Sequence, residues 1–100
     1  MVIEWLKFKI SPNSRDKFLE EDNKIWTQAL SKYPGFLSKE IWLNPENDNE
    51  IILVIKWKSY KLWETLPPED LQIIDDAFSQ AMGNTTYDLI EAKHYNEQRL

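Results

Sequence analysis

The sequence predicts an α+β fold: a ferredoxin-like βαββαβ sandwich in which a four-stranded antiparallel sheet carries two helices on one face. Hydrophobic spacing alternates between strand-like and helix-like periods in the order strand, helix, strand, strand, helix, strand. Residues 51–55 form a continuous apolar run rich in β-branched side chains, which indicates a strand covered on both faces. Right-handed crossovers then place both helices on the same face of the sheet.

Size and charge limit the kind of protein this can be. A length of 100 residues predicts a single domain, residues 1–100, with residues 96–100 expected to fray as a polar tail. The formal net charge of −5 argues against nucleic-acid binding, because phosphate contacts need clustered Lys and Arg. No cysteine is present, which excludes disulfides, thiolate nucleophiles and zinc–cysteine sites. Without a signal sequence or an apolar stretch of about 20 residues, we expect a cytoplasmic protein with no membrane contact.

The first strand and the first helix follow from local patterns. Residues 2–10 alternate from residue 6 onward between apolar and lysine side chains, and Glu4 lies on the apolar side. Pro12 can start a helix, which the apolar spacing continues over residues 13–32. Asp22 falls within or beside the apolar stripe of that helix. A carboxylate is therefore expected near the core on each of these two elements.

A hairpin follows. Residues 36–44 form its first strand, residues 45–49 a turn rich in Asn and Asp, and residues 50–58 its second strand. Ser59 can then cap a short helical turn.

The remaining elements are one helix and one strand. The helix begins at Pro68 and stops at Gly83, and its Asp75 and Asp76 are expected on a solvated face. Residues 86–95 form the last strand, which is expected to lie antiparallel beside the first.

The face of the sheet without helices is also apolar. Ile3 and Trp5 share the lysine side of the first strand, and half of the 51–55 run points the same way. A monomer rarely exposes an apolar surface of that extent. We therefore expect a homodimer in which two copies pack sheet against sheet about a two-fold axis.

Several stretches carry a resemblance to a known family: the opening residues 2–8, Tyr-Pro-Gly-Phe at 33–36, and Ile-Lys-Trp-Lys-Ser at 55–59 leading into Trp63. They resemble the dimeric α/β-barrel superfamily near the antibiotic-biosynthesis-monooxygenase-like (ABM) domains, and are similar to an uncharacterised small family found mainly in cyanobacteria. The resemblance spans essentially the whole chain and implies a dimeric α/β barrel. As an activity it implies a cofactorless monooxygenase-like oxidoreductase acting on a small aromatic compound. The Asn, Trp and His of the superfamily's haem-degrading members have no counterparts here, so haem degradation is not expected.

Three residues are candidates for acid/base catalysis: Asp22, Glu4 and His94. His94 is the only side chain whose ordinary pKa lies near neutrality. In the expected strand order His94 or Lys93 lies near Glu4, either as an acid/base pair or as a simple cross-strand ion pair. Asp22 and Glu4 could share one cavity, where loss of solvent raises carboxyl pKa values, or both could reach the sheet rim or a backbone donor.

Aromatic side chains supply the candidate ligand pocket. Its walls would be Trp26, Trp57, Trp63 and Trp42, although large aromatics also serve as core and interface residues. No His or carboxylate spacing suits a metal, and two glycines cannot build a phosphate loop, so neither a metal nor a cofactor is expected. Two functions stay open: the cofactorless monooxygenase-like enzyme, and a non-catalytic dimeric module that binds a small apolar ligand or a protein partner.

Overall fold

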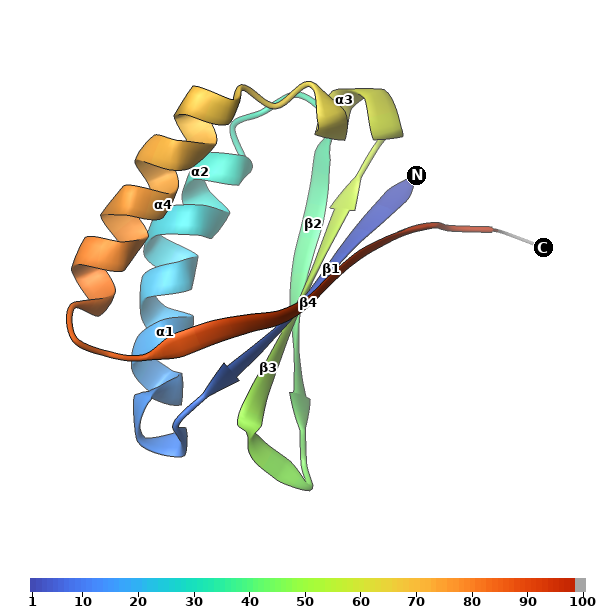
Figure 1. Cartoon of the computed structure of the whole chain (residues 1–100). Coiled ribbons are helices and arrows are strands. Elements are labelled where there is room, and N and C mark those ends of the chain that lie inside the picture. The colour runs from blue at the N-terminus through green and yellow to red at the C-terminus, as the bar shows by residue number, and fades with distance from the viewer. Residues whose placement is uncertain (99–100) are drawn as a thin grey trace.

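The computed structural model describes residues 1–98 and contains one twisted antiparallel sheet with the long helical segments on one side of it (Figure 1). The strands are β1 (Val2–Ile10), β2 (Phe36–Asn44), β3 (Asn47–Trp57) and β4 (Tyr87–Asn96). They lie in the order β2-β3-β1-β4, so the first and last strands are antiparallel neighbours. The predicted ferredoxin-like βαββαβ fold is confirmed.

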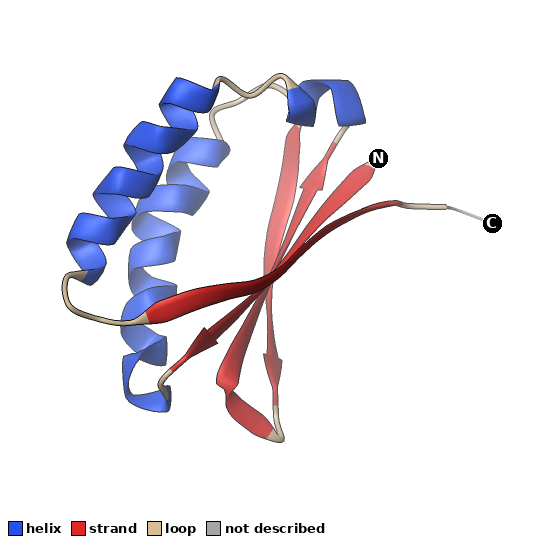
Figure 2. Cartoon of the chain, in the orientation of Figure 1, coloured by secondary structure: helices blue, strands red, loops and turns tan. Residues whose placement is uncertain are grey.

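The first helical segment is continuous but changes its winding (Figure 2). A 3₁₀ turn (Pro12–Ser14) leads into α1 (Arg15–Asp22), followed by a π turn (Asn23–Thr27) and α2 (Gln28–Leu30). The sequence predicts one regular helix here and gives no sign of the π turn. Such turns are rare and often occur at functional sites.

The second helical segment matches its predicted boundaries. In the short helix α3 (Tyr60–Glu64), the Ser59 hydroxyl accepts a hydrogen bond from the Leu62 N–H at 3.2 Å, which is the expected cap. Helix α4 (Pro68–Met82) begins at a proline and ends at Gly83, whose φ of 60° suits a residue without a side chain.

Two predicted boundaries need correction. The hairpin turn is shorter than residues 45–49, because β3 already begins at Asn47. The Asn44 side chain accepts the Glu46 N–H at 2.9 Å and so closes a tighter turn. The predicted frayed tail starts too early: Asn96 belongs to β4, and the Glu97 N–H donates to the Met1 carbonyl at 3.1 Å. Residues 99–100 of that tail lie outside the described residues.

The core lies between the sheet and the helices in two clusters. One contains Phe18, Phe78 and Met82 near the end of β1, and the other contains Leu30 and Trp57 near its start. Most of α4 is poorly buried, with Phe78 and Met82 its only buried residues among those described. The helix therefore does not close fully onto the sheet.

The opposite face of the sheet carries the predicted apolar side chains. Trp5 pairs with Val54 and Trp42 with Ile52 in neighbouring strands, and alternation turns all four away from the helices. Lysine and glutamate side chains share this face, as in the Lys7–Glu50 pair at 3.4 Å. Within residues 1–98, no helix is long and apolar enough to cross a membrane.

Candidate functional site

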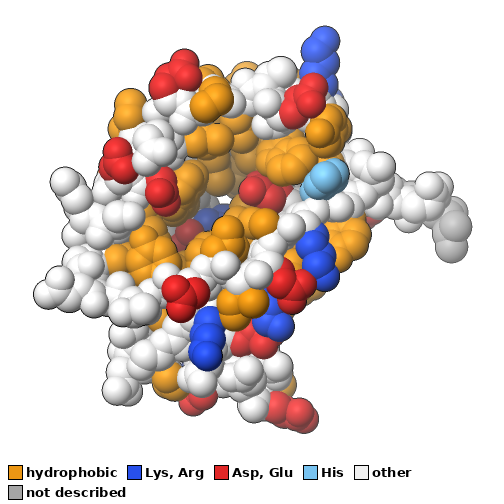
Figure 3. All heavy atoms as spheres, in the orientation of Figure 1, with side chains coloured by type: hydrophobic (Ala, Val, Ile, Leu, Met, Phe, Trp, Pro, Cys, Tyr) orange, Lys and Arg blue, Asp and Glu red, His pale blue; other side chains and the backbone are white. Residues whose placement is uncertain are grey.

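A cavity of about 720 Å³ lies between the inner face of the sheet and the helices, and we call it the central cavity. Figure 3 shows the molecule hollowed on this side, with hydrophobic side chains on the walls and acidic groups around the opening. The apolar lining residues are Leu6, Phe8, Phe18, Trp26, Leu30, Leu53, Ile55, Trp63, Leu66, Leu71, Phe78, Tyr87 and Leu89. A volume of this size and such walls are typical of sites for small organic ligands.

Charged residues on the inner face explain why the space is not filled. Glu4 on β1 and Lys39 on β2 are both register partners of Ile55 on β3, so they stand in one row across the sheet. With neighbouring strands about 4.8 Å apart, their Cα atoms are about 10 Å from each other. Burying such groups against an apolar helix is unfavourable unless each finds a partner. The row therefore favours an open space above it.

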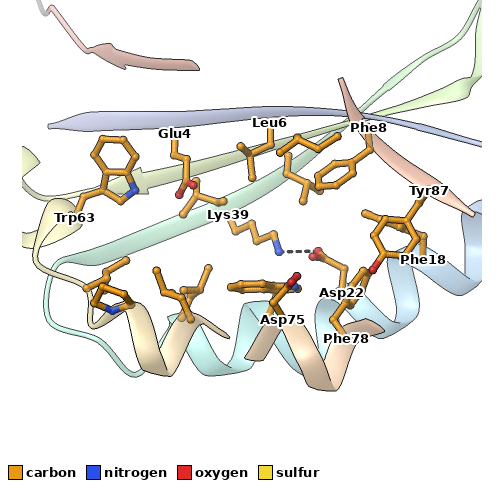
Figure 4. A pocket seen from close by; sticks show the side chains of 18 of the residues that line it. Glu4, Leu6, Phe8, Phe18, Asp22, Lys39, Trp63, Asp75, Phe78 and Tyr87 are labelled. Atoms are coloured by element: carbon orange, nitrogen blue, oxygen red, sulfur yellow. Dashed lines mark hydrogen bonds and ion pairs between the residues drawn. The ribbon is translucent and has the colours of Figure 1, made fainter. Parts of the chain in front are cut away.

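Lys39 forms a buried ion pair with Asp22. The Lys39 Nζ lies 2.6 Å from Asp22 Oδ2, and the two side chains are only 4% and 2% exposed. Figure 4 shows the pair reaching across the cavity from the sheet to the first helical segment. Burial raises the pKa of Asp22, and the neighbouring Lys39 charge opposes this rise. The ion pair neutralises both charges inside the protein.

The second carboxylate of the cavity, Glu4, is only partly compensated. The Trp57 indole Nε1–H donates to Glu4 Oε1 at 3.3 Å. Loss of solvent raises the pKa of Glu4, while hydrogen bonds from Trp57 and Trp63 and the charge of Lys39 lower it. Desolvation dominates, so Glu4 holds a proton more readily than an ordinary glutamate and is a stronger base when ionised.

The third candidate, His94, lies at the edge of the site. It is the register partner of Glu4 across β1 and β4, as expected from the strand order. Its exposed ring contacts Trp63 and Tyr60, with centroid distances of 5.1 Å and 5.7 Å. Its neighbour Lys93 points to the other face, 5.2 Å above the Trp5 ring. The strand register is thus as predicted, but the described contacts of His94 are aromatic.

The four predicted wall tryptophans separate into three environments. Trp26 and Trp63 line the central cavity. Trp57 is fully buried in the core and reaches the site only through its hydrogen bond to Glu4. Trp42 does not belong to the cavity: it is 48% exposed, on the opposite face of the sheet.

Some lining residues were not foreseen from the sequence. Lys39 shares the strand parity of Ile41 and Leu43, a signal that would have placed it on the inner face. Asp75, expected on a solvated surface, lines the cavity opening together with Glu64. Within residues 1–98, no group of three or more His, Asp or Glu side chains is placed to hold a metal ion.

Taken together, these residues form a cavity with aromatic walls and titratable groups inside and at its opening. Glu4 faces the cavity, Asp22 is tied to Lys39, and His94 stands at the opening. The arrangement suits proton removal from an apolar ring compound in a space with little water.

Comparison with known proteins supports this description of the fold. The family model described as "Antibiotic biosynthesis monooxygenase" matches residues 1–65. A mutant of SnoaB, a cofactor-independent oxygenase from Streptomyces nogalater, has a similar structure (TM-score 0.71, 14% identity, 99% of this chain and 94% of that chain covered). So does the monooxygenase from the gene ActVA-Orf6 of Streptomyces coelicolor, solved with Nanaomycin D (TM-score 0.72, 15% identity, 99% and 88% covered). No curated protein sequence matches the chain.

Proposed function

This chain belongs to the antibiotic biosynthesis monooxygenase family, and from that membership we propose that it is a cofactor-independent oxygenase acting on a small aromatic compound. One observation carries the proposal. A glutamate with a raised pKa, Glu4, faces a largely apolar cavity, open on one side, whose walls include Trp26 and Trp63. Such chemistry needs a base, flat apolar walls and limited access of water, and the inner part of the central cavity supplies the base and the walls.

The reaction begins with a proton. Glu4 accepts it from an acidic C–H group that the aromatic rings of the substrate activate, and a carbanion forms. The carbanion gives electrons to O₂, which becomes the oxidant, so that R₂CH₂ + O₂ yields R₂C=O + H₂O. Trp26 and Trp63 hold the rings of the substrate, and the apolar walls limit access of water to the carbanion.

Glu4 is the first candidate for the base on geometric grounds. Asp22 is already bound to Lys39 at 2.6 Å, and a proton acceptor in an ion pair is a weaker base. His94 stands outside the lining and contacts Trp63 and Tyr60. We retain Asp22 and His94 as alternatives to be tested beside Glu4.

Oxygen uptake tests the proposal. Anthrone is a suitable probe, because its methylene group is acidic and its oxidation to anthraquinone and water follows the equation above. Glu4→Gln should lower the rate above the uncatalysed background by about 10²-fold or more. Asp22→Asn and His94→Ala should lower it less, and Glu20→Gln, on the exposed surface of α1 outside the cavity lining, should leave it unchanged. If the wild-type protein binds anthrone but does not accelerate oxygen uptake, the proposed oxygenase activity is refuted.

That last outcome would support the second candidate, a non-catalytic module binding a small apolar ligand. The Asp22–Lys39 pair favours it, because two of the charged groups in the cavity already satisfy each other. Fluorescence quenching of the lining tryptophans by anthrone, without oxygen uptake, is its expected signature.

We also propose that the protein is a homodimer that packs through the outer face of its sheet. Trp5, Ile52 and Trp42 form an apolar surface there; Trp5 and Ile52 are partly exposed and Trp42 is 48% exposed in the single chain. Burial against a second copy would remove this surface from water. Light scattering at micromolar concentration should give the dimer mass, and Trp5→Lys should give the monomer; a monomeric wild type contradicts the proposal. A cytoplasmic location and the closeness to a cyanobacterial family remain predictions from the sequence.

A further inference from the structure

The central cavity is unevenly charged. Among residues 1–98, four carboxylates line it, Glu4, Asp22, Glu64 and Asp75, and one cationic side chain, Lys39. The whole chain has the same bias, with a formal net charge of −5. A ligand entering the cavity therefore passes two exposed carboxylates, Glu64 and Asp75, whose charge water partly screens, and then meets Glu4, which is desolvated and screened less.

Lys39, the cationic lining residue within residues 1–98, is already paired. Lys39 Nζ lies 2.6 Å from Asp22 Oδ2, and its side chain is 4% exposed. Figure 4 shows Asp75 on the helix side of the cavity, across from the sheet. An anionic ligand would have to compete with Asp22 for Lys39 and leave a buried carboxylate unpaired.

Glu4, in contrast, has room for another donor. An ionised carboxylate can accept about four hydrogen bonds. The described partners of Glu4 are the Trp57 and Trp63 indoles. Tyr60 and Trp63, which also line this end of the cavity, lie with ring centroids 5.5 Å apart. Aromatic faces beside a carboxylate form a favourable setting for an ammonium group.

We infer that the central cavity takes aromatic compounds bearing a protonated amino group, placed against Glu4 and Trp63, and rejects aromatic carboxylates of the same shape. The inference rests on the same cavity as the proposed function and concerns the charge of the ligands that bind there; because an ammonium group paired with Glu4 makes that carboxylate a weaker base, a bound amine should slow the oxidation of anthrone. It adds a requirement for charge that the apolar walls alone would not impose.

A matched ligand series tests this. 1-Naphthylmethylamine, 1-naphthylmethanol and 1-naphthoate share a bicyclic ring and are cationic, neutral and anionic near neutral pH. Titration calorimetry under nitrogen should show the amine binding at least about tenfold more tightly than the alcohol, and the carboxylate about tenfold more weakly or not at all. Glu4→Gln should reduce the advantage of the amine, and Asp75→Asn, a surface change at the opening, should reduce it in part. Glu20→Gln is the matched control, since that carboxylate is exposed on α1 and is not part of the cavity lining.

The outcomes are separable from those of the oxygen-uptake test. Naphthoate binding as tightly as the amine, or an amine preference that survives unchanged in both Glu4→Gln and Asp75→Asn, overturns the inference even if anthrone is oxidised. No binding of any of the three ligands at millimolar concentration also overturns it. An amine preference that depends on Glu4 supports it even if no oxidation occurs, because the calorimetry needs no turnover.

Discussion

Replacing Lys39 by methionine should destabilise the fold strongly, because it leaves Asp22 as a buried carboxylate without a counter-ion. The two side chains are 4% and 2% exposed and lie 2.6 Å apart, so little solvent can take the place of Lys39. Removing one partner of a buried pair costs about 3–5 kcal/mol. Domains of this size are stable by about 5–15 kcal/mol, so the loss is a large fraction of the total.

Urea unfolding and thermal unfolding, each followed by circular dichroism at pH 7, measure this loss. The melting temperature should fall by at least about 12 °C, since each kcal/mol shifts it by about 4–8 °C in a domain of this size. Lys24→Met is the control: its partner Glu20 lies at 2.8 Å, the two side chains are 57% and 64% exposed, and about 0–1 kcal/mol should be lost. The double change Lys39→Met with Asp22→Leu should recover most of the stability, because it removes both charges.

The pH dependence gives a further check on the cause. Burial holds the pKa of Asp22 in the folded state above its value in the unfolded state, and the charge of Lys39 offsets part of this rise. Without Lys39 the folded pKa rises further, so the folded state holds the proton over a wider pH range. The deficit of Lys39→Met should therefore shrink as the pH falls toward 4 and grow as it rises to 7. A loss below about 1 kcal/mol at pH 7, or one independent of pH, would refute the reasoning.

Three further substitutions test other parts of the structure. Burial raises the folded pKa of Glu4, so ionisation of Glu4 destabilises the fold as the pH rises through that pKa. The melting temperature of Glu4→Gln should therefore equal that of wild type near pH 4 and exceed it near pH 8. A difference in melting temperature that does not change with pH would contradict this. Gly35→Ala should cost about 1–3 kcal/mol in urea unfolding, because φ is 95° and a Cβ would lie 2.8 Å from Leu62, whereas Gly83→Ala, at φ 60° with nothing within 4 Å, should cost less. Ser59→Ala should cost about 0.5–2 kcal/mol through loss of the cap of α3, and no change would show that the cap contributes nothing.

The elements that local patterns control were predictable. Strand alternation placed Glu4 on the inner face and Trp5 on the outer face, and the βαββαβ order placed His94 or Lys93 near Glu4; the strand register shows that the partner is His94. Pro68 and Gly83 marked the limits of α4, because each restricts the backbone in a way that depends little on the rest of the fold.

The pairing of charges inside the cavity was not predictable in the same way. Asp22 and Lys39 are 17 residues apart, on a helix and an edge strand, and only the packing of one on the other brings them together. Strand alternation puts Lys39 and Trp42 on opposite faces of β2, with Lys39 on the inner face. Trp42 was predicted as a wall of the pocket because it is aromatic, and its position in the alternation was not considered. The π turn that follows Asp22 has no signature in the sequence.

The same charges link the stability of the protein to its proposed function. A sheet face with leucine at positions 4 and 39 would let α4 pack closer and bury more apolar surface, which would stabilise the domain. Instead Glu4, Lys39 and Asp22 occupy the inner side, and burial raises the pKa values of Glu4 and Asp22. Polar groups that weaken a core are expected where a protein uses them. Their position beside Trp26 and Trp63 is the strongest reason to regard the central cavity as a working site and not as a packing defect.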